Sequence, residues 1–143
     1  DWNLQQITGL FAAFSPLKSV TENKRILVNF LNGSRYGHTS LQMNKAELIL
    51  KTNKLEKIDL ILSGRKTSAF HRHLYNPLCK ENVCIDTHLI KYFNKGNIIH
   101  ITPNRYSMYE NAIKKWSKKV NMYPSEIQAI LWISAKQKYG INV

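Results

Sequence analysis

The chain has 143 residues, 43% of them hydrophobic, which supports one folded domain with its own core and excludes a disordered tail. No apolar run approaches the roughly 20 residues that a membrane span requires, and two cysteines are too few for a disulfide framework. Twenty-one Lys and Arg residues against nine Asp and Glu residues give a net charge of +12, which favours a polyanionic partner.

Apolar residues recur at helical spacing in the first half of the chain and predict five helices. These helices cover residues 1–14, 22–32, 41–51, 54–62 and 66–75. The first helix ends at Ser15, because the proline that follows disfavours a helical residue before it. Thr21 is the predicted cap of the second helix. Gly64 lies in the short turn between the fourth and fifth helices, so these two are predicted to form a helix–hairpin–helix.

Three further helices are expected in the second half of the chain, over residues 87–93, 103–120 and 125–139. Asp86 is the predicted N-cap of the first of these helices, and Thr102 is that of the second. Ser125 and Gln128 fit a capping box at the start of the third helix. Because a capping residue is found at the start of each of these three segments, the prediction that they are helices is strengthened.

All eight predicted elements are helical. We therefore predict an all-α fold in a single compact domain of residues 1–143, with the hairpin at about 55–75 and C-terminal helices at about 103–140. Trp116 and Trp132 lie within helical patterns and are predicted to be core residues rather than stacking platforms.

The two cysteines, Cys79 and Cys84, are expected to be free thiols, which suit a reducing compartment. Zinc ligation by these cysteines with His71, His73 and His88 is an alternative, but the spacing fits no common zinc module. We therefore expect neither a metal nor a cofactor. With no signal pattern and no membrane span in the sequence, we expect a cytoplasmic protein without a membrane partner.

The predicted hairpin has the chemistry of a phosphate-binding site. Backbone N–H groups at the turn and at the start of the second helix point outward, and such groups bind a phosphate oxygen without sequence preference. Arg65 adds positive charge at this position. The turn and the basic composition together predict a monomer that binds double-stranded DNA.

Two short motifs in this region resemble a known family. "GRKT" at 64–67, followed about twenty residues later by "CIDTH" at 84–88, resembles the helix–hairpin–helix DNA glycosylase superfamily that contains endonuclease III. "FAAFSPLKSVTENK" at 11–24 and "YGHTSLQMNKAELIL" at 36–50 agree more loosely with early segments of that family, so the resemblance covers roughly residues 4–93. The chain departs from the family because its hairpin lacks the usual first glycine, its region before the hairpin is shorter, and no four-cysteine iron–sulfur cluster follows.

The resemblance implies a DNA glycosylase that is also a lyase at abasic (AP) sites, as in base excision repair. Lys66 matches the family's nucleophilic lysine, and Asp86 matches its catalytic aspartate. The lysine attacks the sugar C1′ as a neutral amine, a form that burial, Arg65 and the positive helix end favour. A carboxylate at a helix N-terminus stabilises the positive charge that develops on the sugar.

Further residues are implied in binding a base-flipped nucleotide. Leu17 takes the place of a glutamine wedge of relatives and would fill the gap in the duplex, or else it is a core residue. His88 either hydrogen-bonds near the catalytic aspartate or only packs. The predicted substrate-binding residues are Gly64, Arg65, Thr67, Leu17 and His88.

Other functions stay open at this point. Taken singly, Lys66 is an ordinary solvated charge and Asp86 an ordinary helix cap. A non-catalytic DNA-binding helix–hairpin–helix protein would suit the compact size and the missing glycine. A base-hypermodification enzyme of the same fold would suit the Asn-, Lys- and Ile-rich composition, which is typical of AT-rich genomes such as those of viruses and phages.

Overall fold

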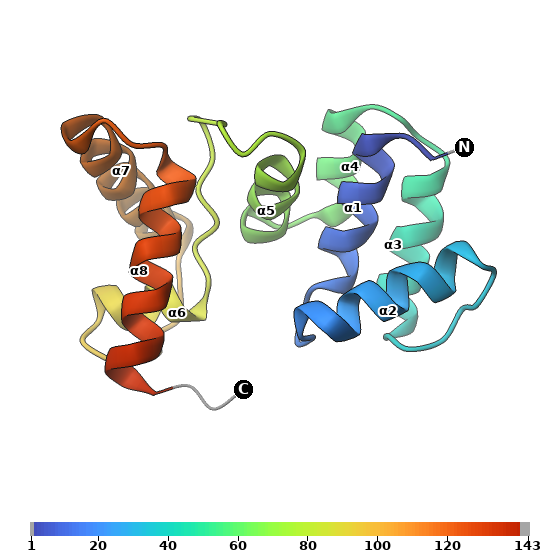
Figure 1. Ribbon diagram of the computed structural model, residues 1–143, viewed down its shortest axis with the longest axis horizontal. Coiled ribbons are helices and arrows are strands. Elements are labelled where there is room, and N and C mark those ends of the chain that lie inside the picture. The colour runs from blue at the N-terminus through green and yellow to red at the C-terminus, as the bar shows by residue number, and fades with distance from the viewer. Residues whose placement is uncertain (1, 141–143) are drawn as a thin grey trace. The chain divides into compact units, whose positions relative to one another are not determined.

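The computed structural model describes residues 2–140, and this range is helical, with connecting turns and loops (Figure 1). Eight α-helices and no strand occur in it, so the all-α prediction is confirmed. The helices are α1 Leu4–Phe14, α2 Val20–Leu31, α3 Ser40–Leu50, α4 Leu55–Leu62, α5 Arg65–Tyr75, α6 Thr87–Phe93, α7 Pro103–Val120 and α8 Pro124–Tyr139. None of these helices combines the length and the apolar character that crossing a membrane requires.

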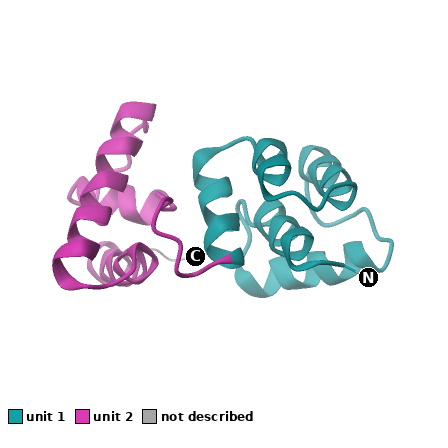
Figure 2. Ribbon diagram, turned by 90° about the horizontal axis from the view of Figure 1, so that it is seen from above, with its two compact units in different colours: residues 1–75 teal, residues 76–143 magenta. Residues whose placement is uncertain are grey.

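The chain divides into two compact units (Figure 2). Unit 1 comprises residues 1–75 and holds α1 to α5, and unit 2 comprises residues 76–143 and holds α6 to α8. Each unit has its own cluster of buried side chains.

Unit 1 is built around α1, which contacts each of the other four helices of the unit. Gly9 brings α1 close to α4, because a Cβ atom there would lie 2.7 Å from the Cγ2 of Ile58. Several α1 side chains are fully buried, namely Leu10, Ala12, Ala13 and Phe14. Small residues on α1 thus allow the surrounding helices to pack tightly against it.

Unit 2 buries an extended segment beside its three helices. Val83 and Ile85, which precede α6, are almost completely buried. The Tyr106 hydroxyl donates to the Val83 carbonyl at 2.7 Å and accepts from the Ile85 N–H at 3.2 Å. The hydroxyl of Tyr106 on α7 therefore provides hydrogen bonds to a buried carbonyl and a buried N–H group, which in a β-sheet would bond to a neighbouring strand.

The predicted caps at Asp86 and Thr102 are confirmed, since their side chains accept hydrogen bonds from the N–H groups of Leu89 and Arg105. The cap predicted at Thr21 is wrong. The second helix starts two residues earlier than expected, and Ser19 accepts the capping bond. Two neighbouring hydroxyl residues could serve here, and the sequence pattern did not distinguish them.

The capping box predicted for the last helix is also wrong. Glu126, not Gln128, reaches back to the start of α8, where its carboxylate accepts from the Tyr123 N–H at 2.7 Å. Ser125 donates to the Pro77 carbonyl, and the Gln128 side chain accepts from a backbone N–H before α6. Ser125 and Gln128 therefore bond to residues of unit 2 that are more than 40 positions away in the sequence, and neither closes a capping box.

Candidate functional site

A two-residue turn, Ser63 and Gly64, joins α4 and α5 of unit 1 at the position predicted for the hairpin. Ser63 ends α4 in the left-handed conformation, with φ of 62°, at the position that glycine commonly takes. A Cβ atom at Gly64 would meet only the Oγ1 of Thr67, at 3.9 Å. Contacts within the protein therefore do not require glycine at position 64, and the approach to this turn is open.

Basic side chains gather at the hairpin turn. Arg65 and Lys66 are exposed in the first turn of α5. Lys45 of α3 adds a third cation, because its Nζ donates to the Leu62 carbonyl at 2.9 Å and to the Ser63 Oγ at 3.0 Å. Sequence reasoning missed Lys45 as a site residue, and its only signal was a lysine–alanine pair in the segment that loosely resembles the glycosylases.

A carboxylate on α4 fixes the position of α5. Asp59 binds the Nδ1 of His71 at 3.0 Å and the Nε of Arg72 at 2.7 Å. The carbonyl of the same aspartate accepts from the Ser68 hydroxyl at 3.1 Å. His71 is fully buried in this arrangement. The hairpin is therefore held by polar bonds between its two helices as well as by apolar packing.

Asp86 lies in unit 2, where both of its carboxylate oxygens accept hydrogen bonds. One oxygen binds the Leu89 N–H at 2.9 Å as the cap of α6, and the other binds the indole N–H of Trp132 at 3.0 Å. The His88 ring packs edge-on against Trp132, with centroids 5.0 Å apart. Trp132 was missed as a neighbour of Asp86 because it lies 46 residues further along the chain.

The prediction that both helical tryptophans are core residues is wrong. Trp116 is 39% exposed, and Trp132 is only partly buried. Helical periodicity predicts which residues share a face, but it does not show how far that face is covered.

Leu17 lies in the turn between α1 and α2. Its side chain is completely exposed and its backbone is left-handed, with φ of 59°, so it is not a core residue. The Nε2 of His38 lies 3.1 Å from the Pro16 carbonyl, and it is the donor because the Nδ1 accepts from the Thr39 N–H. His38 thereby anchors the turn that presents Leu17.

The predicted site residues fall in both units. Leu17 and the four hairpin residues 64–67 belong to unit 1, whereas Asp86 and His88 belong to unit 2. Joint action of Lys66 and Asp86 stays a prediction. Lys66 is exposed, so the burial expected to favour its neutral amine is not found in the free protein.

The alternative zinc ligands do not gather at one point. Within residues 2–140, no three histidine, cysteine or acidic side chains lie close enough together to hold a metal ion. Cys79 and Cys84 are free thiols, and the Cys79 thiol donates to Glu81 at 3.3 Å. This hydrogen bond is the main cause of the lowered pKa of Glu81.

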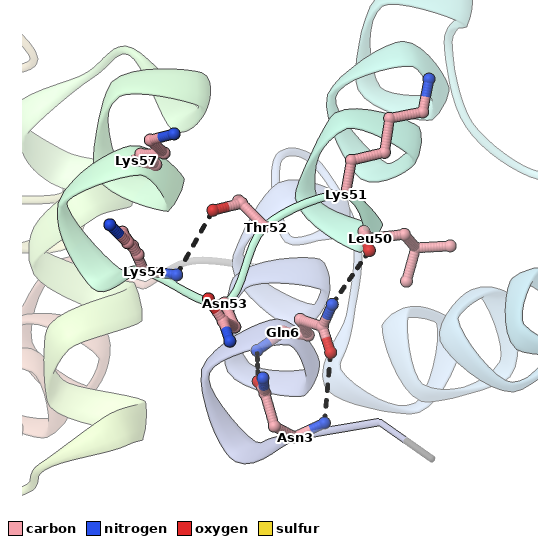
Figure 3. A pocket seen from close by; sticks show the side chains of 8 residues that line it. All are labelled: Asn3, Gln6, Leu50, Lys51, Thr52, Asn53, Lys54 and Lys57. Atoms are coloured by element: carbon pink, nitrogen blue, oxygen red, sulfur yellow. Dashed lines mark hydrogen bonds between the residues drawn. The ribbon is translucent and has the colours of Figure 1, made fainter.

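A polar pocket of about 480 Å³ opens at the N-terminal end of α4 (Figure 3). Its lining contains three lysines and no carboxylate: Asn3, Gln6, Leu50, Lys51, Thr52, Asn53, Lys54 and Lys57. The hairpin turn lies at the other end of α4, so no predicted site residue lines this pocket. The pocket adds to the positive charge of unit 1.

These features define an all-helical, strongly basic protein in which a two-residue turn joins α4 and α5. The chain belongs to DUF7178, a family of unknown function, whose pattern matches residues 1–139. The comparisons with curated proteins and with solved structures give no match.

Proposed function

We propose that this protein is a DNA glycosylase of the helix–hairpin–helix type with AP lyase activity. The observation that carries the proposal is the open turn at Gly64, beside which Lys45, Arg65 and Lys66 present three cations. Backbone N–H groups and cations at such a turn bind a DNA phosphate whatever the base sequence. Lys66 then stands next to the bound strand.

The proposed chemistry uses the Lys66 amine as the nucleophile. The amine attacks C1′ of an extruded nucleotide, the bond between C1′ and the base breaks, and the base leaves with the electron pair and takes up a proton. Asp86 matches the aspartate that stabilises the positive charge on the sugar in the glycosylases that the sequence resembles. The nitrogen then loses a proton and the C1′–O4′ bond of the sugar opens, which gives a Schiff base. The Schiff base loses a C2′ proton and expels the 3′ phosphate, and the strand is nicked. DNA would have to supply the burial that Lys66 lacks in the free protein.

Leu17 supports the base-flipping part of the proposal. A fully exposed leucine in a left-handed turn has no packing role in the free protein. Apolar side chains that insert between base pairs stabilise an extruded nucleotide in other DNA-binding proteins. We propose that Leu17 is such a wedge and that His38 positions it.

Borohydride trapping tests the nucleophile. We expect wild type to form a covalent adduct with a duplex that carries an abasic site, and the Lys66→Ala variant to lose at least 99% of it while keeping most of its duplex binding. Lys24→Ala is the control, because Lys24 is an exposed lysine of α2. Trapping by Lys66→Ala at the wild-type level would show that another amine reacts or that no specific site exists.

A non-catalytic DNA-binding protein is the second candidate. The exposure of Lys66 and the two hydrogen bonds to Asp86 favour it, since a solvated lysine and a helix cap have these properties. In that case duplex binding should weaken steeply with salt, while duplexes with abasic, uracil, oxidised or hydroxymethylated residues should be neither nicked nor trapped. The same incubations therefore separate the two candidates.

A further inference from the structure

We propose that Trp116 of unit 2 is a stacking platform for an unpaired base of single-stranded DNA. This inference rests on the proposed DNA binding but not on the proposed cleavage chemistry. It assigns a role to the sequence "KKWSKK" at 114–119, which the hairpin and the glycosylase resemblance leave unexplained.

Three aromatic rings of unit 2 form one continuous stack. The Phe93 ring is parallel to that of Tyr109 with centroids 4.4 Å apart, and it lies 5.9 Å from Trp116 at an angle of 22°. Tyr109 and Trp116 are two turns apart on α7, or about 10 Å along the helix axis. Phe93 packs against both rings and therefore links Tyr109 to Trp116.

The stack runs from the interior of unit 2 to its surface. Tyr109 is 6% exposed, whereas Trp116 is 39% exposed. The Tyr109 hydroxyl bonds with the Asn94 side chain, which fixes the inner end. The outer end is therefore a rigidly backed indole, and rigid aromatic surfaces bind another flat ring at low entropic cost.

Three exposed lysines of α7 lie close to Trp116 in the sequence, and Lys119, three positions after it, lies on the same face of the helix. Lys115, Lys118 and Lys119 are exposed, and no ion pair of theirs is found in residues 2–140. Lys114 differs, because it pairs with Glu110 at 2.6 Å. Lys118 and Lys119 lie in the last turn of α7, where cations interact favourably with the helix dipole. This effect explains neither the position of Lys115 nor the exposure of the Trp116 ring. An exposed aromatic ring with a free cation on the same helix face suits a nucleic-acid strand, which offers bases and phosphates together.

The inference concerns a single strand and not a duplex, and it concerns Trp116 and not the other two tryptophans. The reasons for these two choices differ. Bases in a duplex have both faces covered by neighbours, so an indole can stack only on an unpaired base. Trp132 donates to Asp86 and has the Lys136 ammonium 4.5 Å from its ring centroid, so its ring is already engaged. Trp2 is exposed, but it lies in unit 1 and provides a control.

The test compares binding of a fluorescent oligothymidine with binding of a duplex of equal length. Trp116→Ala should weaken oligothymidine binding about tenfold, the size of one base–aromatic stack. Trp116→Phe should keep most of the affinity, and Trp2→Ala should keep all of it. Duplex binding should change less than twofold, and circular dichroism establishes that each variant is folded.

A second ligand tests the same contact from the side of the DNA, because it lacks the bases while the protein keeps the indole. A strand of non-reactive tetrahydrofuran spacers keeps the phosphates, so it should bind wild type and Trp116→Ala equally. Equal binding of oligothymidine by wild type and Trp116→Ala would overturn the proposed platform. It would also be overturned if Trp116→Ala lost the same affinity for oligothymidine and for duplex. The double variant Lys45→Ala, Arg65→Ala tests the hairpin separately, since it should weaken duplex binding more than oligothymidine binding.

Discussion

The two units have the same net charge, but the side chains that form their cores differ. Residues 1–75 hold eleven basic and five acidic side chains and residues 76–143 hold ten and four, so each unit has a net charge of +6. Unit 1 packs apolar side chains, Phe14 and Phe30 among them, around one central helix. The core of unit 2 is also largely aliphatic, but it includes the buried tyrosines Tyr106 and Tyr109, whose hydroxyls form hydrogen bonds. The same positive charge is therefore presented by a backbone turn in one unit and beside an aromatic surface in the other.

Under the proposed DNA binding, this difference predicts complementary roles for the two units. A turn with an open backbone and three cations suits a phosphate, which every nucleotide carries. An indole backed by two further rings suits the face of a base, which is available only in unpaired DNA. The comparison predicts that unit 1 contributes salt-dependent duplex binding and that unit 2 contributes a preference for unpaired bases.

The largest effect is expected from truncation of the core of unit 1. Phe14 is fully buried and packs edge-on against Phe30, with centroids 5.3 Å apart. Phe14→Ala should lower the free energy of unfolding by about 3–5 kcal/mol, because it removes apolar contacts and leaves a cavity. Urea denaturation followed by circular dichroism measures it. Leu60→Ala is the control, since Leu60 is 77% exposed, and it should change stability by less than about 0.5 kcal/mol.

An intermediate effect is expected from removal of a hydroxyl in unit 2. Tyr106→Phe should lower the free energy of unfolding by about 1–3 kcal/mol, because the Val83 carbonyl and the Ile85 N–H lose their partner in a buried position. Tyr92→Phe removes the hydroxyl of a half-buried tyrosine and should have little effect. Equal stabilities of the Tyr106 and Tyr92 variants would show that unit 2, like unit 1, is held mainly by apolar packing.

The smallest effect is expected at two surface carboxylates, one in each unit. The pKa of Glu22 is lowered mainly by its hydrogen bond from Lys18, whereas that of Glu81 is lowered mainly by the Cys79 thiol. Lys18→Met should raise the pKa of Glu22 toward its ordinary value and leave that of Glu81 unchanged, as an NMR titration can measure. A constant pKa of Glu22 in this variant would exclude Lys18 as the cause.

The sign of the associated pH dependence follows from the lowered pKa of Glu22. A carboxylate whose pKa is lower in the folded state stabilises the fold above its unfolded pKa, and this contribution is lost as the pH falls through the folded pKa. Wild type should therefore lose this contribution in acid, and the Lys18→Met variant should lack it at neutral pH.

Local physical chemistry was sufficient to predict much of this protein. Helical periodicity and capping depend on residues three or four positions apart, so the sequence alone predicted the helices, the hairpin at Gly64 and the caps at Asp86 and Thr102. Where two capping residues lay close together, as at Ser19 and Thr21, the local pattern was ambiguous and the prediction was wrong.

Only the tertiary structure decided which distant side chains meet. Lys45 reaches the end of α4 across 17 residues, Trp132 reaches Asp86 across 46, and Phe93 enters the α7 stack from another helix. Such contacts depend on how helices pack and on which faces stay uncovered, and both are determined by the whole core. The sequence therefore determined the helices and the charge, whereas packing decided which cations and rings lie together at the surface.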